Sequence, residues 1–338
     1  MRKYSLPFIF LWVSVLLAPV AFAQDQWAFY KGGQGPGKGK HIVWISGDEE
    51  YRSEEALPML AQILSARYGF DCTVLFAIDP KTGAIDGDCQ TNIPGLKSLA
   101  SADLMVIFTR FRELPDEQMK YIDQHLASGK PVIALRTSTH AFNYKRNKNS
   151  PYAKYDFVSS VKGWEGGFGK RVLGETWVDH HGKHGVEGTR GLIDGIAQNA
   201  GNPILKGVKD IWCYSDVYTI KKLPADAETL VYGQSTRALD PESPVNLDKS
   251  IIPVAWTRTY ANEAGKKAKV FATTMGASID LLNEDLRRLL VNACLWAVNL
   301  EAQIPERADV GFISPYNPTM FGFGQSKKGV YPSDFKLK

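Results

Sequence analysis

"PVIALRTSTHAFNY", residues 131–144, passes abruptly from an apolar run into small and polar side chains. A short apolar run bounded in this way is typical of a strand buried in a parallel sheet. Many α/β enzymes carry their nucleophile where such a strand ends, on a sharp turn that leads into a helix. The residue at that turn is Arg136, which cannot attack a substrate, and no glycine flanks the hydroxyl residues that follow it. Nucleophilic hydrolysis at this turn is therefore disfavoured.

The side chains after this turn favour ligand recognition and acid–base chemistry instead. Thr137, Ser138 and Thr139 stand where a helix would begin, and Ser and Thr commonly cap helix N-termini. His140 has an ordinary pKa near neutrality, which suits a general acid or base. We predict that Arg136 and Thr137 bind the ligand and that His140 carries protons.

Strand and helix patterns alternate on both sides of this stretch. An alternating order of strands and helices indicates an α/β fold with a doubly wound, mostly parallel sheet. Such sheets bind their ligands outside the carboxyl ends of the strands. The apolar runs predict strands at 41–46, 72–77, 102–109, 131–135, 253–259 and 269–274, and helical periodicity predicts helices around 56–64, 115–129 and 283–300.

The two ends of the chain differ in character from this region. Residues 1–23 combine basic residues, an apolar run and an Ala-x-Ala motif, which together predict a signal peptide cleaved near Ala23. We therefore expect a periplasmic or secreted protein, and no later apolar run is long enough for a membrane span. Residues 24–40 are predicted to be a linker, residues 41–301 one domain, and residues 302–338 an extended arm without helix or strand.

Charge and cysteine content narrow the functional classes. The net charge is +4 over 338 residues, with no basic stripe, so we expect no nucleic acid partner. Four cysteines in an exported chain can form two disulfides. Cys72 and Cys89 flank a Gly/Asp-rich segment and are the pair we expect, whereas Cys294 fits a buried helix position. The sequence leaves the full pairing and the oligomeric state open.

Polar clusters follow three of the predicted strands. They lie at 48–52, 110–112 and 136–140, and the parallel arrangement would bring all three to one crevice. A single polar loop residue carries little information, whereas a gathering of acids, guanidinium groups and an imidazole suits a polyhydroxylated or anionic small molecule. The segment WCYSDVYTI adds two polar side chains that share one face of an extended chain. The predicted substrate-binding residues are Glu49, Tyr51, Arg110, Arg112, Arg136, Thr137, Asp216 and Tyr218.

Three of the six histidines stand within five residues, in the segment ETWVDHHGKHGVEG. They can offer imidazoles to a divalent metal, with a carboxylate from Asp179 or Glu187 and His140 as a further ligand. The same histidines could instead hydrogen-bond sugar hydroxyls or hold a loop together, and the sequence leaves these alternatives open. The candidate metal ligands are His180, His181 and His184, and the candidate catalytic residues are His140 and His181.

Several blocks of sequence, in order along residues 41–300, carry a family resemblance. They include VWISGDEEYRSEEALPML, ADLMVIFTRFRELPDEQM, GKPVIALRTSTHAF, VLGETWVDHHGKHG and FATTMGASIDLLNEDLRRLLVNACLWAVN. These blocks resemble the ThuA-like family, named for trehalose utilisation proteins, and look most like its exported branch in planctomycete-type bacteria. The resemblance implies a flavodoxin-like fold, shared with class I glutamine amidotransferase domains, and a link to carbohydrate metabolism.

The turn after residue 135 departs from the family pattern. In amidotransferase relatives this turn carries the catalytic Cys, and many ThuA-like proteins have a His there in a Gly-Leu-His pattern. Here Ala134-Leu135-Arg136 stands at that place, and the histidine comes later, at His140. Amidotransferase activity is therefore not expected.

The predicted function is action on a small carbohydrate, a sugar or keto-sugar, by acid–base chemistry with or without a divalent metal. Isomerase, lyase and hydrolase steps each move a proton and need a stabiliser for the developing negative charge. One alternative is a non-catalytic sugar-binding protein that uses the same crevice. Another is an interaction protein that uses the arm 302–338. Binding and catalysis require the same residues, so the sequence does not separate them.

Overall fold

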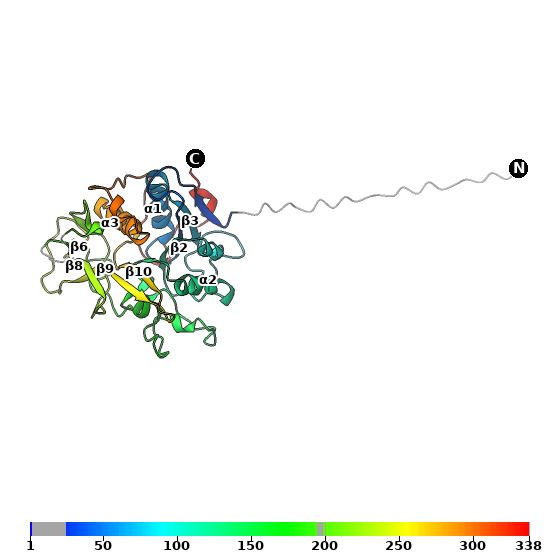
Figure 1. Ribbon diagram of the computed structural model, residues 1–338, viewed down its shortest axis with the longest axis horizontal. Helices are drawn as coiled ribbons and strands as arrows, with labels where there is room; N and C mark the ends of the chain where they lie inside the picture. The colour runs from blue at the N-terminus through cyan, green and yellow to red at the C-terminus, as the bar shows by residue number, and fades with distance from the viewer. Residues whose placement is uncertain (2–24, 195–198, 200, 338) are drawn as a thin grey trace.

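A ten-stranded mixed sheet runs through the part of the chain that the computed structural model describes, which is Met1 and residues 25–194, 199 and 201–337. The strand order is β1-β3-β2-β4-β5-β10-β9-β8-β6-β7. Figure 1 labels β2, β3, β6, β8, β9 and β10 of this sheet. The predicted signal peptide, residues 1–23, lies outside the described residues apart from Met1.

Five parallel strands form the centre of this sheet. In spatial order they are β3 (Asp71–Phe76), β2 (His41–Gly47), β4 (Leu104–Thr109), β5 (Val132–Leu135) and β10 (Lys267–Thr273). Numbered along the chain, these strands take the order 2-1-3-4-5, which is the order of flavodoxin-like doubly wound sheets. The predicted α/β, doubly wound, flavodoxin-like fold class is therefore confirmed.

Antiparallel strands extend both edges of the sheet. β1 (Trp27–Tyr30) pairs with β3, so the segment 24–40 contains a strand and is not simply a linker. Beyond β10 lie β9 (Ile252–Ala261), β8 (Ala227–Ser235), β6 (Thr189–Leu192) and β7 (Ile211–Cys213). The sequence analysis missed β1, β6 and β7, in which three or four residues are too few for a periodic pattern to stand out, and it also missed the nine-residue strand β8.

Helices cover both faces of the sheet (Figure 1). α1 (Ser53–Tyr68) and α3 (Glu284–Ala297) share one buried core with Trp44 of β2. α2 (Asp116–Ala127) packs into the core of the opposite face with Ile45, because successive strand side chains point to opposite sides. The short helical segments are η1 (Leu96–Ala100), η2 (Arg136–His140), η3 (Ala153–Tyr155), η4 (Gly169–Leu173), η6 (Pro203–Leu205), η7 (Ser278–Leu282), η8 (Glu301–Gln303) and η9 (Pro332–Phe335).

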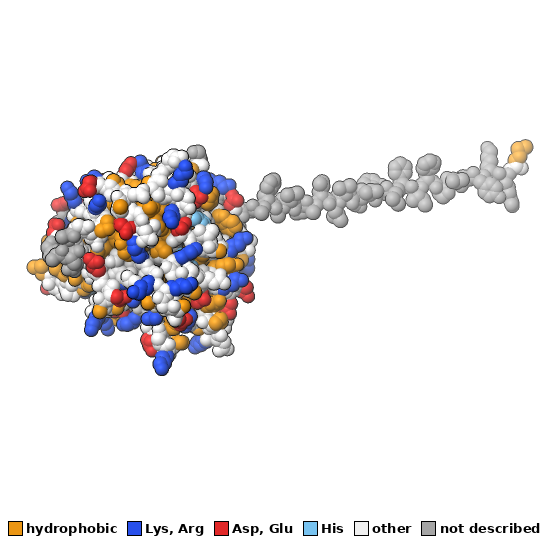
Figure 2. Space-filling model, viewed as in Figure 1, with side chains coloured by type: hydrophobic (Ala, Val, Ile, Leu, Met, Phe, Trp, Pro, Cys, Tyr) orange, Lys and Arg blue, Asp and Glu red, His pale blue; other side chains and the backbone are white. Residues whose placement is uncertain are grey.

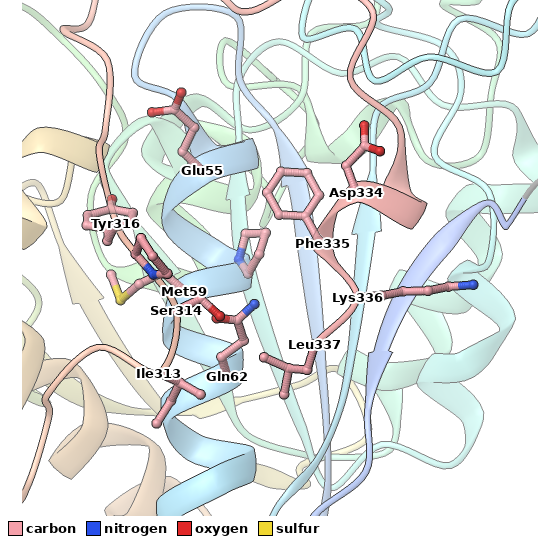
Figure 3. A pocket seen from close by; sticks show the side chains of 12 residues that line it. Glu55, Met59, Gln62, Ile313, Ser314, Tyr316, Asp334, Phe335, Lys336 and Leu337 are labelled. Atoms are coloured by element: carbon pink, nitrogen blue, oxygen red, sulfur yellow. The ribbon is translucent and has the colours of Figure 1, made fainter.

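The arm after residue 301 packs along α1 and is not wholly extended, since it contains η9. The main-chain N–H and the hydroxyl of Thr319 both donate to the carboxylate of Glu55, at 2.8 and 3.0 Å. The ring of Phe335 stacks on that of Phe76 with the centroids 5.4 Å apart. A cavity of about 610 Å³ separates α1 from the arm, and Figure 3 shows Met59, Ile313, Tyr316 and Phe335 among its lining side chains.

Three further features concern the surface charge, membrane-spanning helices and the cysteines. On the face seen in Figure 2, basic and acidic side chains are interspersed. Among the residues with a described position, no helix combines the length and apolar character needed to cross a membrane. All four cysteines are free, so the expected Cys72–Cys89 disulfide is not formed. Cys72 is buried in the core beside α1, whereas Cys89 lies in a partly exposed loop.

Candidate functional site

The loops that follow β2, β4 and β5 meet at the carboxyl edge of the sheet, as the sequence predicts. Glu49 forms ion pairs with Arg110 and Arg112, and its Oε2 lies 2.8 Å from Nη2 of Arg112. Thr137 donates its hydroxyl hydrogen to the carboxylate of Asp48 at 2.6 Å. The three predicted clusters therefore form one connected set of side chains.

Two arginines predicted to bind substrate lie beneath this surface. Arg112 and Arg136 are fully buried. Arg136 donates to the main-chain carbonyl oxygens of Asp216 and Thr274, at 2.7 and 2.9 Å. Arg112 donates to the carbonyl oxygens of the neighbouring loops, those of Gly87, Cys89 and Arg110. These guanidinium groups join loops to one another, and like Thr137 they have no exposed surface.

Arg136 retains the backbone geometry of a nucleophile elbow without the nucleophile. Its φ is +46°, in the left-handed region that residues other than glycine seldom adopt. The guanidinium carbon lies 3.6 Å from the ring centroid of Tyr51 and 5.1 Å from that of Tyr218, which are cation–π contacts. Such a backbone conformation persists only where surrounding contacts hold it. Arg136 therefore supports the candidate site by packing against Tyr51 and Tyr218.

The hydroxyl groups after Arg136 do not cap a helix, contrary to the prediction. Ser138 donates to the carbonyl oxygen of Ile107 in β4 at 2.8 Å. The hydroxyl oxygen of Thr139 lies 3.1 Å from Nδ1 of His140. The segment is only a five-residue 3₁₀ turn, η2, and its hydroxyls are taken up by the strand and side chains packed against it.

His140, the predicted acid or base, lies in an aromatic enclosure. The ring centroids of Phe111, Trp177 and Tyr218 are 5.0, 5.2 and 5.3 Å from that of its imidazole. The residue is 2% exposed, and burial lowers its pKa well below the usual range. The imidazole is neutral at pH 7 but offers little surface to a ligand, so proton transfer by His140 stays a prediction.

His180, His184 and Asp216 converge beside the strand ends. Nδ1 of His180 lies 2.5 Å from Oδ2 of Asp216, and Nδ1 of His184 lies 3.0 Å from Oδ1. One potential ligand atom from each residue falls within 4.8 Å of the others. The Asp216 side chain is buried, whereas those of His180 and His184 are 31% and 37% exposed. The cluster is closed at the carboxylate and open at the two imidazoles.

Backbone pairing explains why His181 is not part of this cluster. The chain at His180 forms an antiparallel bridge with Tyr218, and successive side chains of an extended chain point to opposite sides. The His181 ring therefore faces away, and its Nε2 lies 2.7 Å from the carbonyl oxygen of Ser250. In the candidate ligand set, Asp216 takes the place that the sequence analysis assigned to His181.

The two carboxylates predicted beside the histidines are also used elsewhere. Glu187 accepts hydrogen bonds from the side chain of Asn246 and the main chain of Lys183, both at 2.7 Å. Asp179 accepts from the main-chain N–H of His180 at 2.8 Å. These bonds hold the turn that carries His184 back towards Asp216.

The histidine cluster is electrostatically linked to the acids after β2. Burial would raise the pKa of Asp216, but hydrogen bonds from His180 and His184 outweigh it and lower that pKa to about 2. The hydrogen bond to Asp216 in turn raises the pKa of His184. Nε2 of His184 lies 3.3 Å from Oε1 of Glu50, whose other oxygen is 3.6 Å from Nε of Arg110. Glu50, which the sequence analysis did not select, thus connects the histidine cluster to Arg110 and the acids that pair with it.

Aromatic side chains border this polar cluster, and the sequence analysis assigned most of them no role in it. The Phe321 ring, from the arm, lies 5.4 Å from the rings of both Tyr51 and His184. Nothing local in the sequence indicated that the arm returns to the end of the first parallel strand. The other aromatic rings around the cluster are Phe111, Phe157, Trp177 and Phe323.

Two imidazoles and one carboxylate form a donor set that binds divalent transition metals. Catalytic zinc sites take three protein ligands and leave a further position for water or substrate. Metal-bound histidines also place their second ring nitrogen against a carboxylate, which fixes the ring. His184 has this arrangement, with Nδ1 towards Asp216 and Nε2 towards Glu50. The residues therefore fit a divalent metal with an open coordination position.

Fold and site together define a doubly wound α/β protein with a histidine–carboxylate cluster at its strand ends. No protein-family model and no curated protein matches the sequence. Among solved structures, a Parabacteroides merdae protein described as ThuA-like covers 89% of this chain and 100% of its own, at 15% identity and a TM-score of 0.50. A Bacteroides uniformis protein of the same description covers 79% and 95%, at 13% identity and a TM-score of 0.48. The chain has a ThuA-like, doubly wound fold, and at these identities the likeness concerns the fold alone.

Proposed function

We propose that this protein acts on a small carbohydrate, a sugar or keto-sugar, with a divalent metal held by His180, His184 and Asp216. The observation that carries the proposal is the convergence of two partly exposed imidazoles and a buried carboxylate, whose ligand atoms lie within 4.8 Å of one another. A metal at this place would polarise a carbonyl oxygen, or lower the pKa of a bound water, at the open side of the cluster.

The surroundings of the cluster support a carbohydrate as the ligand. Sugars present many hydroxyl groups, which carboxylates and guanidinium groups bind by charge-assisted hydrogen bonds. Glu50 and Arg110 lie next to the cluster, and the Arg110 side chain is 19% exposed. Sugars also have apolar faces, which the bordering aromatic rings would cover. Export, a role in carbohydrate metabolism and a place in the planctomycete-type branch belong to the same proposal.

Metal binding is the first test. Protein freed of metal with a chelator is titrated with Zn²⁺ by calorimetry, and Co²⁺ is added separately to record visible absorption bands from the bound ion. We expect one Zn²⁺ per chain, and at least about tenfold weaker binding in His184→Ala, which removes a ligand, and in Asp216→Asn, which replaces a charged carboxylate with a neutral amide.

His181→Gln is the matched control, because His181 is adjacent in sequence but contacts Ser250 outside the cluster. It should bind Zn²⁺ like the parent protein. Failure of the parent protein to bind Zn²⁺ or Co²⁺ would remove the metal from the proposal. The same follows if His181→Gln loses as much Zn²⁺ affinity as His184→Ala while its circular dichroism spectrum is unchanged.

Sugar binding and turnover are the second test. Melting temperatures are measured with a panel of pyranosides and keto-sugars, with and without Zn²⁺, since a ligand that binds the folded state raises the melting temperature. Products are sought by NMR after long incubation. Stabilisation with turnover supports the proposed enzyme, whereas stabilisation without any product favours the non-catalytic sugar-binding protein.

A further inference from the structure

The arm presents one aromatic side chain to solvent at the edge of the candidate site. Phe323 is 57% exposed, whereas Phe321, two residues earlier, is 5% exposed. Glycines flank Phe323 on both sides, and both have positive φ, +136° for Gly322 and +68° for Gly324. The chain therefore turns sharply around Phe323, in a conformation that favours glycine on either side of it.

This turn is held in place by the loop after β2. The main-chain N–H of Gly322 donates to the carbonyl oxygen of Glu50 at 2.8 Å, and its carbonyl oxygen accepts from Arg52 at 2.6 Å. Phe321 packs between Tyr51 and His184. The position of Phe323 is thus defined by the residues that carry the site.

The Phe323 ring contacts Arg110, a charged residue of the candidate site. The guanidinium carbon of Arg110 is 5.0 Å from the Phe323 ring centroid and 4.4 Å from that of Phe111. The same guanidinium group forms ion pairs with Glu49 and Glu50. Arg110 therefore connects this exposed aromatic ring to two carboxylates, and one of them, Glu50, pairs with His184.

We propose that Phe323 is a sugar-stacking residue, which packs against the apolar C–H face of a pyranose ring bound at this site. A pyranose has hydroxyl groups around its rim and C–H bonds on its faces, so it can use the acids and the aromatic ring at once. The inference rests on the proposed function and narrows its substrate class to cyclic sugars. It makes the arm part of the binding site, since the arm supplies the ring.

The test compares Phe323→Ala, Phe323→Trp and Phe312→Ala. Phe312 is the matched control, because it is a part-exposed aromatic residue of the same arm that packs on Tyr316 and Arg287, away from the strand ends. The probes are glucose, methyl glucoside and maltose as cyclic sugars, and sorbitol as an acyclic polyol without a ring face. Dissociation constants are measured by calorimetry, and Zn²⁺ binding is measured on the same samples.

We expect Phe323→Ala to weaken binding of the cyclic sugars about tenfold, with Phe323→Trp and Phe312→Ala close to the parent protein. Zn²⁺ affinity and any sorbitol binding should not change. Cyclic-sugar affinity that is unaltered in Phe323→Ala would overturn the stacking role alone. A parent protein that binds none of the cyclic sugars would overturn both this role and the proposed carbohydrate function.

Discussion

Arg136 holds Asp216 from beneath, since its Nη1 donates to the main-chain carbonyl oxygen of Asp216 at 2.7 Å and its Nη2 lies 3.7 Å from the Asp216 carboxylate. Both side chains are fully buried. A cation at the turn after β5 thus sets the position of the carboxylate that joins the two histidines. Arg136 contributes to the candidate site through Asp216.

Arg136→Met should strongly destabilise the protein. Removing one partner of a buried ion pair leaves an uncompensated charge and costs about 3–5 kcal/mol. Arg136→Lys should recover little of this loss, because an ammonium group lacks the flat guanidinium face that packs 3.6 Å from the Tyr51 ring centroid and the second nitrogen that lies 3.7 Å from the Asp216 carboxylate. The free energy of unfolding is measured in urea. Arg237→Ala is the control, since its ion pair with Asp248 is exposed and should contribute less than about 1 kcal/mol.

The protein should lose stability in mild acid partly through His125, on α2. Burial lowers the pKa of His125 to about 4, whereas the unfolded chain has a value near 6.5. Between pH 6.5 and pH 4 the unfolded state therefore binds more protons, and stability falls as the pH falls through this window.

His125→Gln removes that group and can still donate to the carbonyl oxygen of Pro131, which lies 3.0 Å from Nε2 of His125. The stability advantage of the parent protein over this variant should therefore shrink by on the order of 3 kcal/mol from pH 7 to pH 4. Urea denaturation at several pH values measures it. Two curves that stay parallel across this range would show that His125 is not the responsible group.

Deleting residues 304–338 should lower both the melting temperature and the sugar affinity. The deletion uncovers the apolar surface under Phe335 and Phe321, and a buried aromatic side chain contributes about 1.5–3 kcal/mol. It also removes Phe323. Calorimetric melting with and without a binding sugar measures both effects. An arm that served only as a contact surface for a partner would leave the sugar affinity unchanged.

The cysteines should react with a thiol reagent in two classes. Burial raises the pKa of Cys72 to about 12, and that of Cys213 and Cys294 well above the usual range, so these thiols are inert in the folded state. Cys89 is partly exposed and should react first. Four thiols should react in denaturant, and a count of two there would indicate a disulfide.

The hydrophobic pattern of the sequence was enough to predict most of the parallel strands and the three α-helices. It also predicted that the polar residues after those strands lie close together. The predicted strand at 41–46 and the strand β2, His41–Gly47, differ by one residue. The meeting of Glu49 with Arg110 follows from parallel strands that end at one edge. Burial of individual side chains did not follow, because Arg112 and Arg136 read as polar surface residues and lie instead under the site.

The sequence by itself determined the doubly wound sheet, the edge that carries the site and the unsuitability of the elbow for nucleophilic attack. These features depend on periodicity over a few residues and on the chemistry of one residue, Arg136. Only the tertiary structure decided which polar groups meet. His180 joins Asp216, 36 positions away, while its neighbour His181 faces Ser250 because side chains alternate along an extended chain. Contacts between distant segments depend on packing of the whole chain, which no local pattern records.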